Sequence, residues 1–285
     1  MPPPDLRPLD FGEILDASLM IYRRHVGLFL KLAVITLAAP VVLFVYFGFQ
    51  LFTDFGQDPL RILLILPVGL LYYVASLVLT AGTIRIISDS YLGRTARLRD
   101  ALSLGMSKIW PLIAVGLGKG IVLALIMIGT GVVAAIMIPL TRSVGAVGAI
   151  VAVALVGGGI WFAIYVACGY GVTTPVVVLE DLTSSFDAFG RSWDLTRGFK
   201  GKVLGLSVVA FLLCNLIPSQ VFQAVATAVM PTAPAVGVGL MVCSVVLPLI
   251  LAPVIASVIT LMYYDLRVRR EAFDLQVLGQ QLGMI

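Results

Sequence analysis

The chain has little of what catalytic and metal sites are built from. Its 285 residues include one histidine and three cysteines, and only 12% of them are charged. His25 and three cysteines set within apolar segments cannot supply a standard zinc site, and no GxSxG, HExxH or Walker A sequence occurs. The cysteines lack CxxC spacing, so we expect them to be buried packing residues. We therefore predict that the protein is not an enzyme and has no catalytic residue, cofactor or metal.

Long uncharged segments make up most of the chain instead. Hydrophobic residues account for 60% of it, and the mean hydropathy is +1.08, far from soluble globular usage. Because a helix needs about 20 apolar residues to cross a bilayer, the sequence predicts an all-α integral membrane protein with six transmembrane helices. The predicted spans are residues 27–52, 60–87, 110–140, 144–179, 203–229 and 236–264.

Glycine and proline mark three interruptions in these apolar segments. The sequence Met-Pro-Thr-Ala-Pro at 230–234 predicts the turn between the last two spans. The three glycines at 157–159 predict a bend in the overlong fourth span. The end of that span, 172–179, contains Pro175 and is expected to leave the bilayer separately. No acidic residue lies in any predicted span, which disfavours a carboxylate proton relay or cation site.

A threefold internal repeat organises the chain. Glu13, Asp100 and Asp187 lie 87 residues apart and mark corresponding points in the amphipathic segments 11–25, 98–110 and 186–200. Each segment is followed by two apolar stretches, so the repeating unit is a surface helix and a transmembrane hairpin. We predict a single membrane domain over 1–285. Its repeats are about 10–94, 95–182 and 183–270, and 271–285 forms a cytoplasmic tail.

The amphipathic segments carry helix-start signals. Asp10 precedes Glu13 by three residues, and Ser184 precedes Asp187 by three, as in a capping pair. Each segment has one apolar face and a basic C-terminal end, which suits a helix in the headgroup region. Such a helix could simply orient the next span, or it could bind lipid or a partner protein.

Basic residues concentrate in alternate connections, at the N-terminus, between spans 2 and 3, between spans 4 and 5, and in the tail. The positive-inside rule therefore places both termini and all three amphipathic segments in the cytoplasm. The opening Met-Pro-Pro-Pro-Asp does not resemble a cleavable signal peptide, so we expect the first span to direct insertion. The net charge of +4 indicates attraction to anionic phospholipid rather than to nucleic acid.

The candidate functional residues are basic or aromatic. In the third amphipathic segment, Trp193 could anchor at the headgroup boundary while arginines reach lipid phosphates; the alternative is a set of internal ion pairs with Asp187 or Asp194. Lys119 is the one charge that could sit at depth, as a functional intramembrane group or as a side chain that snorkels to the interface. The candidates for a lipid-headgroup site are Arg23, Arg24, Arg191, Trp193, Arg197, Lys200 and Lys202.

Three stretches resemble a known family. They are 6–24 (LRPLDFGEILDASLMIYRR), 175–181 with 188–198 (AFGRSWDLTRG), and 263–275 (YYDLRVRREAFDL). Together they are similar to bacterial proteins with the glycerophosphoryl diester phosphodiesterase membrane domain. The resemblance covers nearly the whole chain and implies a multi-helix domain of the bacterial inner membrane.

The family name comes from proteins that fuse this domain to a soluble phosphodiesterase barrel. This chain has no room for a barrel of about 250 residues, and one histidine cannot furnish the paired-histidine chemistry of that enzyme. The resemblance therefore implies no catalytic residues here.

Two functions remain open, with a third less favoured. The first is a non-enzymatic scaffold or accessory factor that interacts with phospholipid at the cytoplasmic face, with membrane lipids as its partners. The second is a transporter or flippase-like conduit for a lipid or small solute, which would need a hydrated, polar-lined path between repeats. An intramembrane hydrolase would need converging polar groups, and the sequence offers only scattered ones such as Asn215 and Ser219.

Overall fold

The computed structural model describes residues 7–53 and 62–271, and within these ranges the chain is helical with short connections. The predicted tail, 271–285, lies outside the described residues apart from Glu271. The helices are α1 (Phe11–Thr53), α2 (Ile62–Tyr91), α3 (Leu98–Ser107), α4 (Ile109–Val144), α5 (Ala146–Gly169), α6 (Thr173–Leu179), α7 (Asp187–Thr196), α8 (Lys200–Phe211), α9 (Ile217–Val229) and α10 (Pro234–Glu271), with a π-helical turn, Leu212–Leu216, between α8 and α9.

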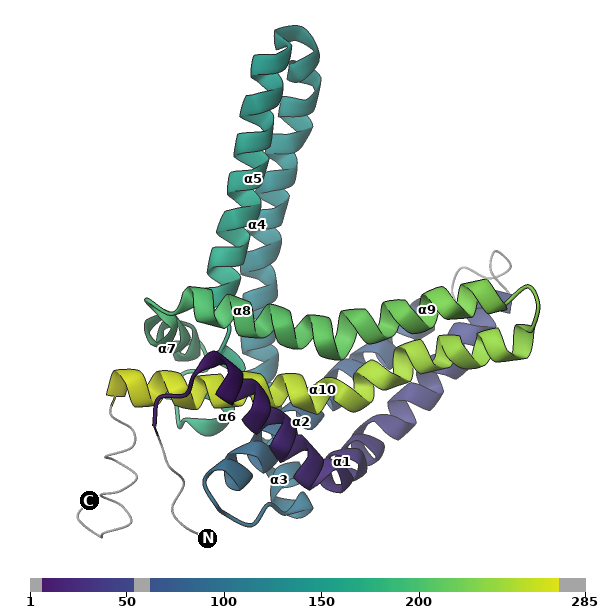
Figure 1. Cartoon of the computed structure of the whole chain (residues 1–285), viewed down its shortest axis with the longest axis vertical. Coiled ribbons are helices and arrows are strands. Elements are labelled where there is room, and N and C mark those ends of the chain that lie inside the picture. Colours follow the sequence, from purple (N-terminus) through teal and green to yellow (C-terminus); the bar gives the residue numbers. More distant parts are fainter. Residues whose placement is uncertain (1–6, 54–61, 272–285) are drawn as a thin grey trace.

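Three long helical hairpins dominate the molecule. They are α1–α2, α4–α5, and the α8–α9 helix with α10 (Figure 1). Among the described residues, six helices are long and apolar enough to cross a membrane, which agrees with the predicted number of spans. Their ranges are Phe11–Leu43, Leu66–Tyr91, Ile109–Pro139, Ala146–Leu179, Lys200–Val229 and Pro234–Glu271.

The hydrophobic core lies where the hairpins meet. We call this region, residues 9–32, 81–115, 168–210 and 258–270, the base; it contains the main cluster of buried apolar side chains. Beyond it the first and third hairpins contact each other through α1 and α10. The α4–α5 hairpin stands away from both (Figure 1), and the most apolar window of α4 has no buried residue.

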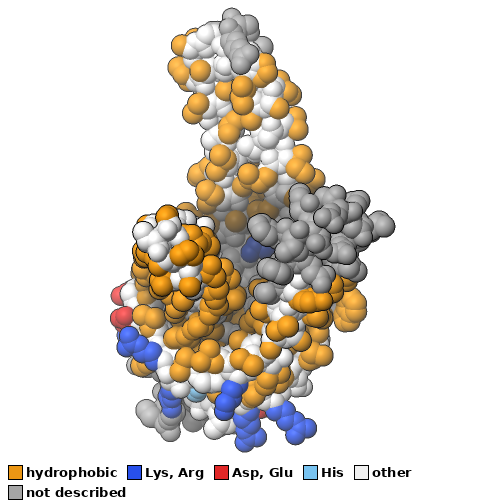
Figure 2. Space-filling view, turned by 90° about the vertical axis from the view of Figure 1, so that its right-hand side faces the viewer, with side chains coloured by type: hydrophobic (Ala, Val, Ile, Leu, Met, Phe, Trp, Pro, Cys, Tyr) orange, Lys and Arg blue, Asp and Glu red, His pale blue; other side chains and the backbone are white. Residues whose placement is uncertain are grey.

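The outer surface separates by polarity. Apolar side chains cover the hairpins, and basic side chains gather along the lower edge, at the base (Figure 2). An apolar helix satisfies its own backbone hydrogen bonds and can therefore present such side chains to lipid. The surface is that expected of a helical membrane protein with a polar end.

Helices occupy all three predicted amphipathic segments: the first turns of α1, then α3, then α7. Both predicted capping pairs make their contact. The Asp10 backbone N–H donates to the Glu13 carboxylate at 2.8 Å, and the Ser184 N–H donates to the Asp187 carboxylate at 2.9 Å. Each bond satisfies a backbone donor at the helix start, which otherwise has no partner in the helix. Arg97, before α3, makes no such side-chain cap.

After each of the three predicted amphipathic segments, the residue just before the apolar helical stretch has similar backbone angles. The residues are His25 (φ −118°, ψ 16°), Lys108 (φ −97°, ψ 10°) and Phe199 (φ −118°, ψ 13°). These angles lie near the bridge region, outside the helical well. At His25 the helix therefore kinks inside α1. Lys108 separates α3 from α4, and Phe199 is the last residue of the short connection 197–199 between α7 and α8.

The predicted turn between the last two spans is confirmed and lies at 230–233. Residues 173–179 form a separate short helix, α6, after α5, and its departure from the bilayer stays a prediction. The predicted bend at 157–159 is wrong, because α5 runs through these glycines without a break (Figure 1). Gly159 instead permits close packing: a Cβ there would overlap the Thr130 side chain of α4.

Candidate functional site

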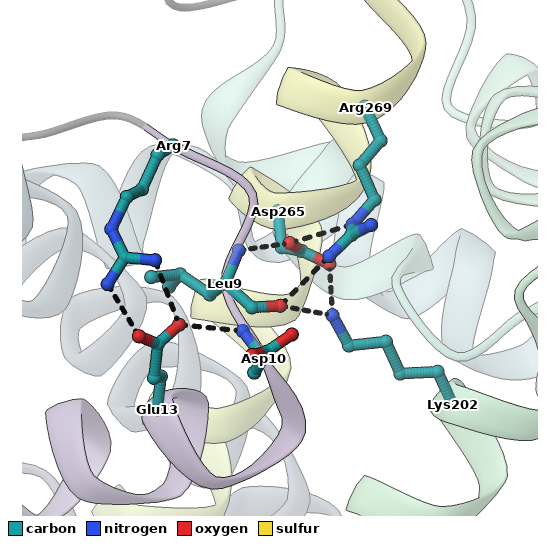
Figure 3. A network of polar contacts seen from close by, with 7 residues as sticks. All are labelled: Arg7, Leu9, Asp10, Glu13, Lys202, Asp265 and Arg269. Carbon is teal, nitrogen blue, oxygen red and sulfur yellow. Dashed lines mark hydrogen bonds and ion pairs between the residues drawn. The ribbon is translucent and has the colours of Figure 1, made fainter.

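Asp265 is the centre of a buried polar network at the base (Figure 3). The residue, on α10, is 1% exposed. Its carboxylate accepts hydrogen bonds from the Leu9 backbone N–H at 2.8 Å, from Lys202 Nζ at 2.6 Å and from Arg269 Nε at 3.0 Å. The Leu9 carbonyl accepts from Lys202 at 2.7 Å and from Arg269 Nη2 at 3.0 Å. The network joins the N-terminal segment to α8 and α10.

The start of α1 is held next to this network. Glu13, which caps the helix at Asp10, also accepts a hydrogen bond from Arg7 Nη1 at 3.3 Å. Figure 3 shows this pair beside the Leu9 backbone, on the side away from Lys202. The first amphipathic helix is thus fixed by its own cap and by the polar groups that bind Leu9.

A second network surrounds Arg191 on α7. Its Nε donates to Glu180 at 3.0 Å, and its guanidinium pairs with Glu271. Tyr263 on α10 donates to the same Glu180 at 2.8 Å, and Arg267 donates to Glu271 at 3.0 Å. Hydrogen bonding to Glu271, and then to Glu180, raises the pKa of Arg191 above its usual value. The network joins α6, α7 and α10.

These contacts bear on two of the residues considered for lipid binding. Arg191 forms internal ion pairs, with Glu180 and Glu271 rather than with Asp187 or Asp194. Lys202 is bound to Asp265, with a side chain only 17% exposed. Both cations therefore face carboxylates of the same chain, and their observed contacts join helices of the base.

Trp193 lies within an aromatic cluster. Its ring centroid is 5.7 Å from that of Tyr165 and 5.9 Å from that of Tyr170, and it packs so closely over Gly169 that a Cβ there would overlap the ring. Lys200 Nζ lies 3.3 Å from the Tyr165 ring centroid and 3.4 Å from a Trp193 ring centroid. Among the described residues this ammonium has no hydrogen-bond partner, so cation–π contact is its main favourable interaction.

Lys119 contacts the neighbouring helix of its hairpin. Its Nζ donates to the carbonyl of Tyr170, the residue that follows α5, at 3.4 Å. A cation at the C-terminal end of a helix is favourable because the last carbonyls carry partial negative charge. This contact joins α4 to the residue that follows α5.

The remaining candidate arginines are exposed. Arg24 has an interaction within the protein, whereas Arg23 and Arg197 make no side-chain ion pair or hydrogen bond with the described residues. The Arg197 carbonyl accepts from Arg270. Arg23 lines a cavity between α1, the π-helical turn and α10. These two arginines are thus the candidates with a guanidinium available to an outside anion.

Sequence reasoning did not single out Asp265 or Glu180, although both organise the base. A signal for Asp265 existed, because Arg269 follows it by four residues, the spacing of an ion pair on one helix face. Its bonds to Leu9 and Lys202 have no such local signal.

No family model matches this chain, and neither a curated protein nor a solved structure matches it. The class of protein therefore rests on the fold: the six long apolar helices found among the described residues, joined at the base, are compatible with a polytopic membrane protein.

Proposed function

We propose that this chain is a non-enzymatic protein of the bacterial inner membrane that binds anionic phospholipid at its base, as a scaffold or accessory factor. One observation carries the proposal: three amphipathic helices converge on the base and leave exposed arginines there without an ion-pair partner among the described residues. These arginines include Arg97 and Arg99 around the start of α3 and Arg197 after α7. Guanidinium groups at a membrane surface suit phosphate oxygens.

The proposal includes the threefold repeat. The capping contacts Asp10–Glu13 and Ser184–Asp187 support it, because equivalent partners lie at twice the 87-residue spacing. The junctions His25 and Phe199 lie at the same separation, with nearly equal backbone angles. The middle copy departs in lacking the cap and in the position of its junction, because Lys108 lies 83 residues after His25 rather than 87. Membership of the glycerophosphoryl diester phosphodiesterase membrane domain family, and cytoplasmic termini, are further parts of the proposal.

The test is lipid enrichment around the purified protein in nanodiscs that contain equal amounts of dioleoyl phosphatidylglycerol and phosphatidylcholine. We expect phosphatidylglycerol to be enriched. The combined change of Arg97, Arg99 and Arg197 to Gln should lower that enrichment, by about fivefold for each charge removed, since each basic residue near an anionic surface contributes about 1 kcal/mol. The same three positions changed to Lys keep the charge and serve as the control. Equal occupancy by the two lipids in the wild type would refute the proposal.

A second candidate is a conduit for lipid between leaflets. Figure 2 shows a hollow between hairpins with a basic side chain at its back, the kind of feature that a headgroup path would require. The two apolar cavities beside α1 and α10, in contrast, have almost no polar lining, which favours an acyl chain over a hydrated solute. Transbilayer movement of a fluorescent phospholipid in proteoliposomes distinguishes the two functions. A conduit increases the rate of this movement, whereas a scaffold leaves the rate equal to that in empty liposomes.

A further inference from the structure

One cavity at the base combines apolar walls with a single free charge. It has a volume of about 340 Å³ and lies between the first part of α1, the π-helical turn and α10. Leu15 and Leu19 line it from α1, and Val254 and Val258 from α10. Arg23 is its one charged lining residue. We call it the Arg23 cavity.

The π-helical turn forms one wall for a reason visible in the sequence. Pro218 has no backbone N–H and cannot donate to the carbonyl of Cys214, four residues earlier. The Ile217 N–H bonds instead to the Leu212 carbonyl, five residues back, which widens the helix locally. Leu213 and Cys214, within this turn, line the cavity.

Arg23 differs electrostatically from Arg191 and Lys202. Arg191 and Lys202 are neutralised by carboxylates of the chain, but Arg23 is exposed and has no ion pair among the described residues. The hydroxyl of Tyr22, a polar group beside it, already donates to the Ile250 carbonyl at 3.1 Å. The cavity therefore offers an apolar interior and one cation for an anion to meet.

The dimensions suit a hydrocarbon chain. From Leu15 to Arg23 the helix rises about 12 Å. A second, apolar cavity of about 250 Å³ shares the wall residue Tyr22 and reaches Val41. The hydrocarbon of one leaflet is about 15 Å deep, so the part of α1 that lines the Arg23 cavity is of comparable length.

We infer that the Arg23 cavity binds one anionic phospholipid, with an acyl chain against Leu19, Leu213 and Val254 and with the phosphate on the guanidinium of Arg23. This inference rests on the proposed phospholipid interaction and gives it a specific site. The apolar walls disfavour a hydrated solute, because polar groups of such a solute would lose their water without gaining hydrogen bonds. A phospholipid matches both features of the cavity, because its acyl chain suits the apolar walls and its phosphate suits the Arg23 guanidinium.

The experiment counts lipid molecules retained by the detergent-purified full chain in native mass spectrometry. Dioleoyl phosphatidylglycerol and dioleoyl phosphatidylcholine, which share their acyl chains, are titrated separately, and inorganic phosphate is a third arm. Leu213→Trp fills the cavity, and Leu216→Trp is its control, because Leu216 is an exposed leucine of the same π-helical turn that does not line the cavity. Arg23→Gln removes the charge, and Arg23→Lys keeps it.

We expect the wild type to retain one phosphatidylglycerol in preference to phosphatidylcholine. Arg23→Gln should weaken this binding by about tenfold, the usual effect of losing a hydrogen bond to a charged group. Leu213→Trp should weaken it by at least as much, because the indole occupies the volume that the acyl chain needs. Leu216→Trp and Arg23→Lys should retain it, and melting temperatures of all four variants show whether they are folded.

Equal retention by Leu213→Trp and Leu216→Trp would overturn the inference, even if lipid enrichment in nanodiscs persists and the proposed function stands. Displacement of the lipid by inorganic phosphate at equal concentration would also overturn it, because the site would then select a free anion. If the wild type shows no lipid enrichment in nanodiscs but still retains one phosphatidylglycerol in mass spectrometry, the proposed role of Arg97, Arg99 and Arg197 is refuted. The Arg23 cavity then stands as a separate lipid site.

Discussion

Removal of the Asp265 carboxylate tests whether the polar network holds the base together. In Asp265→Ala, Lys202 and Arg269 lose their shared counter-charge, and the Leu9 N–H loses its acceptor. Removing one partner of a buried ion pair costs about 3–5 kcal/mol. Because the Lys202 and Arg269 side chains are 17% and 26% exposed, water can partly solvate them, and we expect the low end, about 3 kcal/mol.

The assay is unfolding of the purified protein in mixed micelles, titrated with sodium dodecyl sulfate and followed by tryptophan fluorescence. Asp194→Ala is the control, since Asp194 is exposed on α7 and forms no ion pair with the described residues; its effect should stay within about 0.5 kcal/mol. Hydrogen exchange supplies a second measurement. The amide of Leu9 should exchange faster than in the wild type in Asp265→Ala, and at the wild-type rate in Asp194→Ala.

A double-mutant cycle then isolates the ion pair. Asp265→Ala and Lys202→Met together should destabilise the protein by about 1–3 kcal/mol less than the sum of the single changes, because the second change removes the charge left unpaired by the first. The reasoning is refuted if Asp265→Ala costs no more than Asp194→Ala, or if the two changes at the pair are strictly additive.

Three further changes test other contacts, each by thermal or detergent unfolding. Gly169→Ala should cost about 1–3 kcal/mol because its Cβ would overlap the Trp193 ring, whereas Gly157→Ala, with open space around it, should be neutral or stabilise by about 0.5–1 kcal/mol; equal effects would contradict this packing. Arg191→Ala should cost about 1–3 kcal/mol, reduced by the 31% exposure of its side chain, and an effect below about 0.5 kcal/mol would mean that its ion pairs contribute little. Glu13→Ala should cost about 1 kcal/mol through the lost cap, and an unchanged stability would show that the cap bond is replaced by water.

The sequence predicts those parts of the fold that depend on neighbouring residues. Apolar runs of sufficient length predict the six long helices, and two residues three apart predict the caps at Asp10 and Ser184. The prediction of a bend at 157–159 is wrong because glycine permits a bend but does not cause one. Gly159 instead lets α5 pack closely on the Thr130 side chain, where a Cβ would not fit.

The candidate site is less predictable because its partners are distant in sequence. Arg191 looks available to lipid until α10 brings Glu271 to it, and Lys202 until Asp265 does so. The local sequence around a basic residue near an interface is the same whether the residue contacts lipid or a carboxylate of its own chain. The exposed Arg23 and the paired Lys202 could therefore not be distinguished before the helices were placed.

The bonds between Leu9 and Asp265 have a consequence for biosynthesis. The two residues are separated by 256 positions, so the ribosome makes nearly the whole chain before the acceptor for the Leu9 N–H exists. The Leu9 carbonyl can meet Lys202 once α8 is made, but the bonds with Asp265 and Arg269 form only after α10 is complete. A chain that stops before α10 therefore holds its N-terminal segment by fewer bonds, by which a protease could distinguish unfinished copies from complete ones.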